Sequence, residues 1–428
     1  MKKLLMAAAA AATASTAAFG AGFGIYEASA RGNAVGGALV GDAGDATANY
    51  YNPANIAFAT NIQFAAGMTF INPYCDVEVD HVSQDRMNPG WFTVPNAYLV
   101  VPLPWDFAFG WGNYTEFGLG THYSGGWDLA ADTQATTMEQ ITLNPNLAYK
   151  VLDNLSVSAG LRASWIEFDN HKEPYNGESF LYEYAPGQFL NTGIRDAYDL
   201  HSKLKGDDWA VGWNAAVNFK ATEDLSFGLV YRSRIHHKIR GNFDLKGGVR
   251  TPAGTVGQYY HSSARAHLRL PRSITGGVNY KVTQRYRVGA TLTWTEWSSV
   301  DEINFHIPGY GYKLPLKWRD TWRVGIGMEY DLLDWLTLRC GYVFDEDPTS
   351  KHHSTSMLPC GDRHIIGTGL GFKLADNLFL DLGYSFIRMN NEHYFVKYNK
   401  PDGTQGSKRY SVRNGHSHLV SASVRYSF

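Results

Sequence analysis

The sequence predicts an all-β protein: a transmembrane antiparallel β-barrel of about 14 strands, with an N-terminal segment folded into its lumen. Apolar and polar residues alternate over many short stretches, and the connections between these stretches alternate between short and long. The chain also ends on an alternating stretch with an aromatic residue, Phe428. Period-two alternation is typical of strands that separate two environments, and short turns opposite long loops are typical of outer-membrane barrels.

The first twenty residues, MKKLLMAAAAAATASTAAFG, indicate a secretory signal peptide. Two lysines precede an apolar run, and Ala18 and Gly20 are small enough for a cleavage site. A membrane anchor is the alternative, but the segment is short for a span. We therefore divide the chain into a signal peptide (1–20), an N-terminal segment (21–60) and a barrel (61–428).

The alternation is clearest in residues 155–165, 225–232, 286–294 and 378–386, and again in the last eleven residues. One face of each stretch carries Leu, Val, Ala and aromatic residues, whereas the other carries mostly Gly, Ser and Thr with scattered Arg. A soluble β-sandwich would carry more Lys and Glu on its polar face. Small polar residues instead suit the crowded interior of a barrel.

The connections give the strand number. Six are short and seven are long, so thirteen connections predict fourteen strands, with both barrel ends on the periplasmic side. The short turns are 103–106, 152–154, 222–224, 282–285, 332–335 and 374–377; the long polar loops lie near 79–90, 124–136, 173–206, 247–258, 306–312, 347–361 and 395–410.

Composition excludes several classes of protein. The net charge of −2 does not suggest a nucleic-acid partner. No apolar stretch after residue 20 is long enough for a helical span, and a mean hydropathy of −0.28 is compatible with a barrel whose lumen is polar. Cys340 lies on the apolar face of its stretch, which favours a lone lipid-facing thiol; a Cys340–Cys360 disulfide is the alternative, and Cys75 has no evident partner.

Residues 31–54 are rich in glycine, which raises the question of a phosphate-binding loop. The stretch lacks the closing G-K-[ST], and no strand-like run precedes it. A wide barrel needs a plug, and glycine lets the backbone of a plug pack closely against wall side chains. We expect Asp42 and Asp45 of this plug to pair with inward arginines such as Arg162, Arg232 or Arg339.

The stretch AGFGIYEASARGNAVGGALVGDAGDATANYYNPA (21–54), with Asn52-Pro53-Ala54 at its end, resembles the N-terminal hatch of the FadL family of outer-membrane long-chain fatty-acid transporters. The resemblance continues through WAVGWNAAVNF (209–219), LVYRSRIHHKIRGNF (229–243), LRLPRSI (268–274), TWTEWS (293–298), 320–348 and LPCGDRH (358–364). It covers nearly the whole mature chain and implies a fourteen-stranded barrel plugged by its hatch.

The resemblance implies passive uptake of hydrophobic molecules, with long-chain fatty acids as the expected ligand. It implies capture outside the cell, rearrangement of the hatch, and lateral exit where the third strand bends inward. Lys172, and either Lys313 or Lys317, are the expected partners of a ligand carboxylate. The expected hatch and gating residues are Phe23, Asn52, Pro53 and Ala54, and the expected exit bend comprises Glu116, Phe117, Gly118, Leu119 and Gly120.

Other functions stay open at this point. Relatives that carry aromatic hydrocarbons need no carboxylate partner, so an aromatic-hydrocarbon channel is the first alternative. An outer-membrane lipid hydrolase is the second, with Ser417 and His416 as examples of its residue types, and a plain porin or adhesin is the third. The pairs at 236–237 and 352–353 invite a metal interpretation, but adjacent histidines on a strand face opposite sides.

We therefore expect a monomeric transporter in the bacterial outer membrane that is not an enzyme and holds no cofactor or metal. Its expected partners are a hydrophobic small molecule, outer-membrane lipid and lipopolysaccharide, and the barrel-assembly machinery, which would meet the C-terminal strand.

Overall fold

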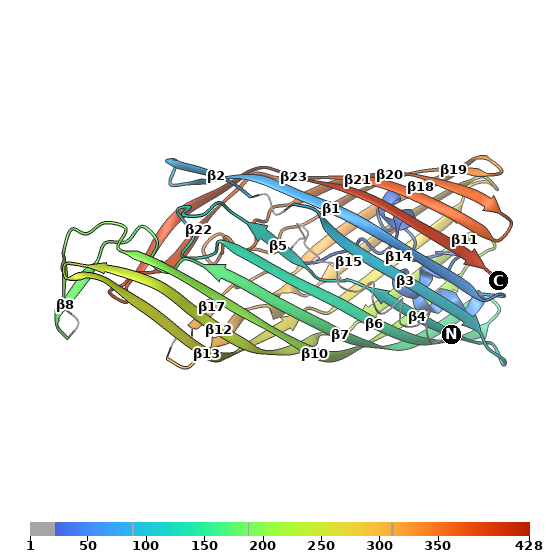
Figure 1. Ribbon diagram of the computed structural model, residues 1–428. Coiled ribbons are helices and arrows are strands. Elements are labelled where there is room, and N and C mark those ends of the chain that lie inside the picture. Colours follow the sequence, from blue (N-terminus) through green and yellow to red (C-terminus); the bar gives the residue numbers. More distant parts are fainter. Residues whose placement is uncertain (1–21, 88–89, 187, 310–311) are drawn as a thin grey trace.

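A computed structural model describes residues 22–87, 90–186, 188–309 and 312–428, so the predicted signal peptide lies outside the described residues. The described chain forms a closed ring of antiparallel strands, in which the last strand pairs with the first (Figure 1). Gln63 opposes Ser427 at one end of this seam, and Val79 opposes Tyr410 at the other.

Fourteen wall strands build the ring, several of them interrupted, which confirms the predicted fold. In ring order they are β1 (Gln63–Val79); β2 (Ser83–Met87) with β3 (Phe92–Pro102); β4 (Phe107–Tyr114) with β5 (Leu119–His122); β6 (Ala135–Leu152); β7 (Leu155–Lys172); β10 (Tyr198–Lys220); β11 (Leu225–Arg232) with β12 (Ile235–Thr251); β13 (Gly254–Leu270) with β14 (Ser273–Lys281); β15 (Tyr286–Thr295) with β16 (Glu302–His306); β17 (Tyr312–Pro315) with β18 (Thr321–Leu333); β19 (Leu336–Asp345); β20 (Arg363–Ala375); β21 (Leu378–Met389) with β22 (Glu392–Asn399); and β23 (Gln405–Ser427).

Each strand alternates in burial, as the sequence predicts. In β23, Val420 and Val424 point outward with 48% and 42% of their surface exposed, whereas Ser421 and Ser423 point inward and are buried. A soluble protein would bury the valines; a barrel in lipid presents them to the acyl chains and keeps polar groups inside. Among the described residues, no helix is long and apolar enough to cross a membrane.

All six predicted short turns connect wall strands, but three predicted long loops are wrong. Residues 79–90, 247–258 and 395–410 mostly continue the strands into tall hairpins that turn at 80–82, 252–253 and 400–404. Above the membrane both faces of a strand meet water, so the alternation fades although the hydrogen-bonded ladder continues. The loop after β7 carries a separate small hairpin, formed by β8 (Leu181–Ala185) and β9 (Gln188–Asn191).

The N-terminal segment, residues 22–62, lies inside the ring, at the end that carries the short turns (Figure 1). It contains three short helices: α2 (Ala30–Ala34), α3 (Ala48–Tyr51) and the 3-10 helix η1 (Pro53–Phe58). Helix α2 packs against β19, β20, β21 and β23, whereas η1 packs against β4, β6, β7 and β10 on the other side of the lumen. The segment therefore crosses the lumen from wall to wall. A second 3-10 helix, η2 (Trp297–Ser299), interrupts the wall between β15 and β16.

Glycines of the wall make room for this segment. A β-carbon on Gly327 of β18 would overlap the carbonyl oxygen of Val35, and one on Gly367 of β20 would overlap the carbonyl oxygen of Asn33. The backbone of the N-terminal segment therefore lies directly on the wall, without intervening side chains. Further glycines whose β-carbons would meet its backbone are Gly228, Gly289, Gly325 and Gly341.

The three cysteines are free thiols, so the Cys340–Cys360 disulfide is wrong. Cys340 lies half-buried on the outward face of β19, next to Leu338 and Tyr342 in the alternation, as the alternative predicts. Cys360 lies buried inside, where its Sγ approaches the carbonyl oxygen of Gly22 at 3.9 Å. The two thiols thus face opposite sides of the wall.

We predict that Gly327→Ala opens the barrel to ions. The new methyl group meets a carbonyl oxygen rather than a flexible side chain, so the N-terminal segment must shift away from β18. Conductance in a planar lipid bilayer should rise above that of the wild type. Gly276→Ala is the matched control, since a β-carbon there meets no atom within 4 Å; conductance equal to wild type in both variants would contradict the close fit.

Candidate ligand pathway

An apolar cavity lies inside the upper half of the barrel, on the side away from the short turns. It encloses about 550 Å³ of empty space. Its lining combines inward residues of β5, β6, β7, β12, β13, β16 and β17 with residues 355–358 and with Phe23 of the N-terminal segment. The lining residues include Leu119, Met138, Phe168, Leu268, Phe305 and Met357. Because almost every lining group is hydrocarbon or aromatic, the cavity favours an apolar ligand.

Phe23 and Trp318 line the lower side of this cavity and pack against two further aromatic residues, Trp297 and Phe117. The ring of Phe23 lies 4.9 Å from that of Trp297, 5.4 Å from that of Trp318 and 5.8 Å from that of Phe117, measured between centroids. The contacts with Trp297 and Phe117 are edge-to-face, an arrangement that stabilises aromatic pairs. We call these four residues the aromatic floor.

A polar chamber lies on the other side of the aromatic floor, with about 720 Å³ of empty space. Arg162 donates to Glu116 over 2.5 Å, and Arg232 lies 3.4 Å from the same carboxylate. Arg323 also lines the chamber; its buried Nε lies 3.5 Å from Asp345, an ion pair without a hydrogen bond. Two or three arginines thus face one glutamate, which leaves the chamber attractive to an anion.

The third strand leaves the wall beside these two cavities. Strand β4 pairs with β3 only over Ala97–Pro102, and in the described residues β5 pairs with β6 but has no ladder with β2 or β3. Between β4 and β5 the chain pairs with the N-terminal segment instead. Ile25 N donates to Glu116 O over 2.8 Å, and Gly118 N donates to Phe23 O over 2.9 Å.

This geometry puts the predicted bend residues in one place. Phe117 pairs with Gly24 in a β-bridge, Glu116 faces the polar chamber, and Leu119 faces the apolar cavity. Gly118 and Gly120 lie on either side of Leu119, where the strand resumes. Whether a ligand leaves through this interruption stays a prediction.

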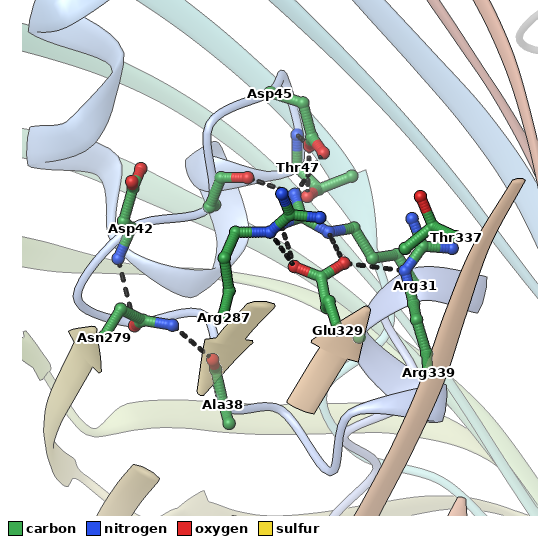
Figure 2. Close-up of polar contacts among 12 residues, drawn as sticks. Arg31, Ala38, Asp42, Asp45, Thr47, Asn279, Arg287, Glu329, Thr337 and Arg339 are labelled. Carbon is green, nitrogen blue, oxygen red and sulfur yellow. Dashed lines mark hydrogen bonds and ion pairs between the residues drawn. The ribbon is translucent and has the colours of Figure 1, made fainter. Parts of the chain in front are cut away.

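Six charges form a closed ring between the N-terminal segment and the wall, which we call the charge ring; Figure 2 shows its members Arg31, Asp45, Glu329 and Arg339. Arg31 and Asp45 come from the segment and lie 2.8 Å apart, and Arg31 lies 2.7 Å from Glu329 of β18. The ring continues through the wall back to Asp45. The remaining links are Glu329–Arg339 at 2.7 Å, Arg339–Asp381 at 2.8 Å, Asp381–Arg425 at 2.5 Å and Arg425–Asp45 at 3.2 Å.

The charge ring alternates in sign and balances three arginines against three carboxylates. Burial disfavours the ionised form of Asp45, but Arg425 and Arg31 outweigh burial and hold its pKa below the ordinary value. Thr47 adds two hydrogen bonds to the same carboxylate, from its backbone N and its hydroxyl. Removal of one member of such a buried set leaves its partners unpaired and typically costs about 3–5 kcal/mol.

The predicted pairing of Asp42 and Asp45 with Arg162, Arg232 or Arg339 is wrong. Asp45 pairs with Arg31 and Arg425, and the backbone N of Asp42 donates to Asn279 (Figure 2). Alternation in a strand shows which residues face the lumen but not their height along the axis. Arg162 and Arg232 lie at the height of Glu116, and Arg339 pairs with Glu329 and Asp381.

Asn52, Pro53 and Ala54 start the helix η1 and lie buried. The side chain of Asn52 accepts from Ala54 N over 3.0 Å and donates to the carbonyl oxygens of Val40, over 2.9 Å, and of a residue in β10. The carbonyl oxygen of Ala54 accepts from Ser156 of β7. The motif thus fastens the end of the N-terminal segment to the wall; a gating role stays a prediction.

The three predicted ligand lysines do not line the apolar cavity. Lys172 lies at the end of β7 and lines a separate, more polar cavity with Asn170 and Ser202. Lys313 and Lys317 are exposed and alternate with the cavity-lining residues 314, 316 and 318. Lys313 pairs with Glu302 at 3.2 Å. Binding of a carboxylate by these lysines stays a prediction.

The structure does not bring together the residues that the hydrolase and metal-site alternatives require. Ser417 is buried inside β23, whereas His416 faces outward and lies 2.7 Å from the carbonyl oxygen of Asn414. His237 points inward toward Asp208, and its neighbour His236 is exposed on the other face of β12. Among the described residues, no group of three or more His, Cys, Asp or Glu is placed to hold a metal ion.

The sequence does not reveal Trp297, Trp318 or Arg323 as pathway residues. Their contacts with the N-terminal segment join positions more than 250 residues apart, and no local pattern encodes such contacts. The interruption at η2 was the available signal, since the alternation of residues 286–295 stops directly before Trp297.

Comparison with known proteins identifies relatives along the whole chain. A family model described as outer membrane protein transport protein (OMPP1/FadL/TodX) matches residues 11–428. Outer membrane protein P1 of Haemophilus influenzae is 26% identical over 88% of each chain. A long-chain fatty acid transport protein of Escherichia coli O6:H1 is 25% identical over 97% of this chain and 96% of its own.

Solved structures share the fold. A FadL homologue of Pseudomonas aeruginosa superposes with a TM-score of 0.80 at 22% identity and covers 95% of this chain and 100% of its own. The toluene transporter TodX of Pseudomonas putida superposes with a TM-score of 0.72 at 18% identity, covering 94% and 98%.

We predict that Asp45→Asn opens the barrel to ions at pH 7, because Arg31 and Arg425 then lose their shared carboxylate. Folding lowers the pKa of Asp45. The ionised Asp45 carboxylate therefore stabilises the folded state fully above the ordinary aspartate pKa of about 3.9, and this stabilisation is lost as the pH falls through the lower pKa of the folded state. The wild type should therefore stay closed at pH 7 and conduct only in acid below about pH 3.9.

Asp42→Asn is the matched control, because Asp42 contacts Asn279 through its backbone N. Conductance of Asp45→Asn at pH 7 that equals both the wild type and this control would contradict the role of the charge ring.

Proposed function

The chain belongs to the OMPP1/FadL/TodX family of outer-membrane transport proteins, and from this we propose that it takes up hydrophobic molecules, with long-chain fatty acids as the cargo. The observation that carries the proposal is the apolar cavity, which lies beside the interrupted third strand and above the segment that fills the lumen. The protein resides in the outer membrane, as its family does, and we propose that it performs no chemistry on its cargo.

The route has three steps. A hydrophobic molecule enters from the side of the tall hairpins and moves into the apolar cavity. Burial there removes apolar surface from water at about 25 cal/mol per Å². A shift of the N-terminal segment then moves Phe23 away from Trp297 and Trp318 and opens the aromatic floor.

The exit lies at the interruption of the third strand. Residues 115–118 hold the N-terminal segment through two backbone hydrogen bonds, so a shift of the segment also frees this part of the wall. A ligand that leaves there enters the lipid directly and never returns its hydrocarbon to water. An exit straight into the periplasm would forfeit the free energy gained on burial.

The polar chamber favours a fatty acid over an uncharged hydrocarbon. A carboxylate that reaches the chamber meets Arg323, whose buried Nε makes no hydrogen bond, and it competes with Glu116 for Arg162. Charge-assisted hydrogen bonds of this kind are roughly twice as strong as neutral ones. We propose that this competition weakens the ion pair between Arg162 and Glu116. Ligand binding would then change the conformation of the predicted exit bend, of which Glu116 is part.

An aromatic hydrocarbon is the second candidate cargo. Phe23, Phe168, Phe305 and Trp318 line the apolar cavity and offer ring contacts to such a ligand. The toluene transporter TodX shares the fold, so the fold does not distinguish the two cargoes. They differ in whether binding depends on a carboxylate of the ligand.

We further propose that the protein works as a monomer, since β23 closes the ring against β1 within a single chain. We also propose that the barrel-assembly machinery meets the C-terminal strand, whose outward face ends on the exposed Phe428.

We predict distinct effects of two variants on the binding of oleate and of its uncharged methyl ester. Ala266→Trp fills the apolar cavity and should weaken the binding of both ligands by roughly 5- to 150-fold, because overpacking costs ~1–3 kcal/mol. Arg323→Gln should weaken the binding of oleate and spare the methyl ester. Binding to detergent-purified protein and uptake by cells that lack their own transporter are the measurements.

Ser263→Trp is the control for Ala266→Trp, because Ser263 is exposed on the outer face of the same strand. If Ala266→Trp binds both ligands as the wild type does, the cavity is not the ligand site. If Arg323→Gln weakens the methyl ester as much as oleate, the carboxylate does not select the ligand.

A further inference from the structure

A cationic patch covers the outer face of β12 and β13, the two strands whose inner face lines the apolar cavity. Lys238 and Arg240 of β12 and Arg265 and Arg269 of β13 are all exposed, whereas their neighbours along each strand, such as Ile239 and Ala266, point inward. We call these four residues the cationic patch. The two strands that carry it extend to the end of the barrel with the tall hairpins (Figure 1).

Like charges face one another across the two strands. Arg240 lies directly opposite Arg265, His236 opposite Arg269, and Lys238 opposite His267. Like charges in directly opposed positions destabilise a sheet. The chain has nonetheless placed Arg240 and Arg265 in such a pair on the surface, where opposite charges would be the more stable choice, and the other two cations of these rows face histidines rather than carboxylates.

Nearby carboxylates do not neutralise the patch. Glu296 is held by Arg234 and Arg272, and Glu302 by Lys313. Asp207 of β10 lies opposite Arg240, without an ion pair between them among the described residues. Four cations therefore face two carboxylates, Asp207 and Glu302, and Lys313 also engages Glu302.

The patch borders the apolar outer surface of β10. Trp209 lies two residues after Asp207 on the same face of β10, and 58% of its surface is exposed. Val211 and Trp213 continue this face, with 67% and 50% of their surface exposed. In a soluble protein such a row would be buried; on a barrel it marks the lipid-facing band and its aromatic rim. Cations and lipid-facing hydrocarbon thus meet at one place on the surface.

We propose that the cationic patch binds the phosphate groups of the glycolipid in the outer leaflet, lipopolysaccharide, with its acyl chains against Trp209, Val211 and Trp213. Such a lipid carries anionic phosphates directly above hydrocarbon, which matches the order of groups on the barrel. Basic clusters at a membrane surface attract anionic lipid, and each Lys or Arg adds to the attraction. The proposal rests on the outer-membrane location and not on the identity of the cargo.

The experiment measures binding of bisphosphorylated lipid A in detergent micelles to the purified full-length protein. The variant K238Q/R240Q/R265Q/R269Q should bind it at least about tenfold more weakly than the wild type. A second variant, R240Q/R265Q, removes one opposed pair and should give an intermediate loss; it keeps the test informative if the fourfold variant assembles poorly. Oleate binding should be unchanged in both variants, which shows that the lumen is intact.

The matched control is K246Q/K351Q/K397Q/K400Q, which removes the same charge from the tall hairpins and loops. It should bind lipid A as the wild type does. Lipid A without phosphates should bind the wild type as weakly as the fourfold variant binds the phosphorylated form, and inorganic phosphate should not displace lipid A. Equal binding by the wild type and both patch variants, equal binding of the dephosphorylated lipid, or displacement by inorganic phosphate would overturn the proposal.

Discussion

The contact between the N-terminal segment and the inner wall is the constraint on which the rest of the structure depends. A ring of fourteen strands has a lumen too wide for its own side chains to fill. Residues 22–62 fill it at one end, and their backbone rests on glycines such as Gly327. A segment held only by apolar packing could slide along the barrel axis. The charge ring fixes its height, because Arg31 and Asp45 each need partners at one position on the wall.

The same contact divides the lumen into regions of different polarity. Above the segment the wall is apolar and encloses the cavity lined by Phe168 and Leu268. Below Phe23 the arginines around Glu116 form a polar chamber. The segment also replaces the missing neighbour of the third strand, since the carbonyl oxygen of Glu116 and the backbone N of Gly118 form backbone hydrogen bonds with it. Plug, cavity floor and wall interruption are therefore one mechanical unit, and movement of the segment changes all three.

The sequence predicted the features that repeat. Alternation with small polar residues predicted the barrel, and the thirteen connections between alternating stretches predicted the strand number. The resemblance of residues 21–54 and of segments along the barrel predicted the plug and the family. Features that depend on height or on distant contacts were not predictable. Asp45 was expected to meet Arg162, Arg232 or Arg339, yet it meets Arg31 and Arg425, because alternation fixes the facing of a side chain and leaves its axial position open. The tall hairpins were mistaken for loops because strands above the membrane lose their apolar face.

Photolabelling of the transport route tests the central claim most directly. A fatty acid with a photoreactive group at the end of its chain is added to cells that carry the protein, and the labelled residues are identified by mass spectrometry. The account predicts labels in the apolar cavity, at residues such as Met138 and Leu268, and at the interruption of the third strand around Phe117. Labels around Asp42 and Glu329, at the periplasmic end of the N-terminal segment, with none around Phe117, would show that the ligand passes straight through the plug and would contradict a lateral exit.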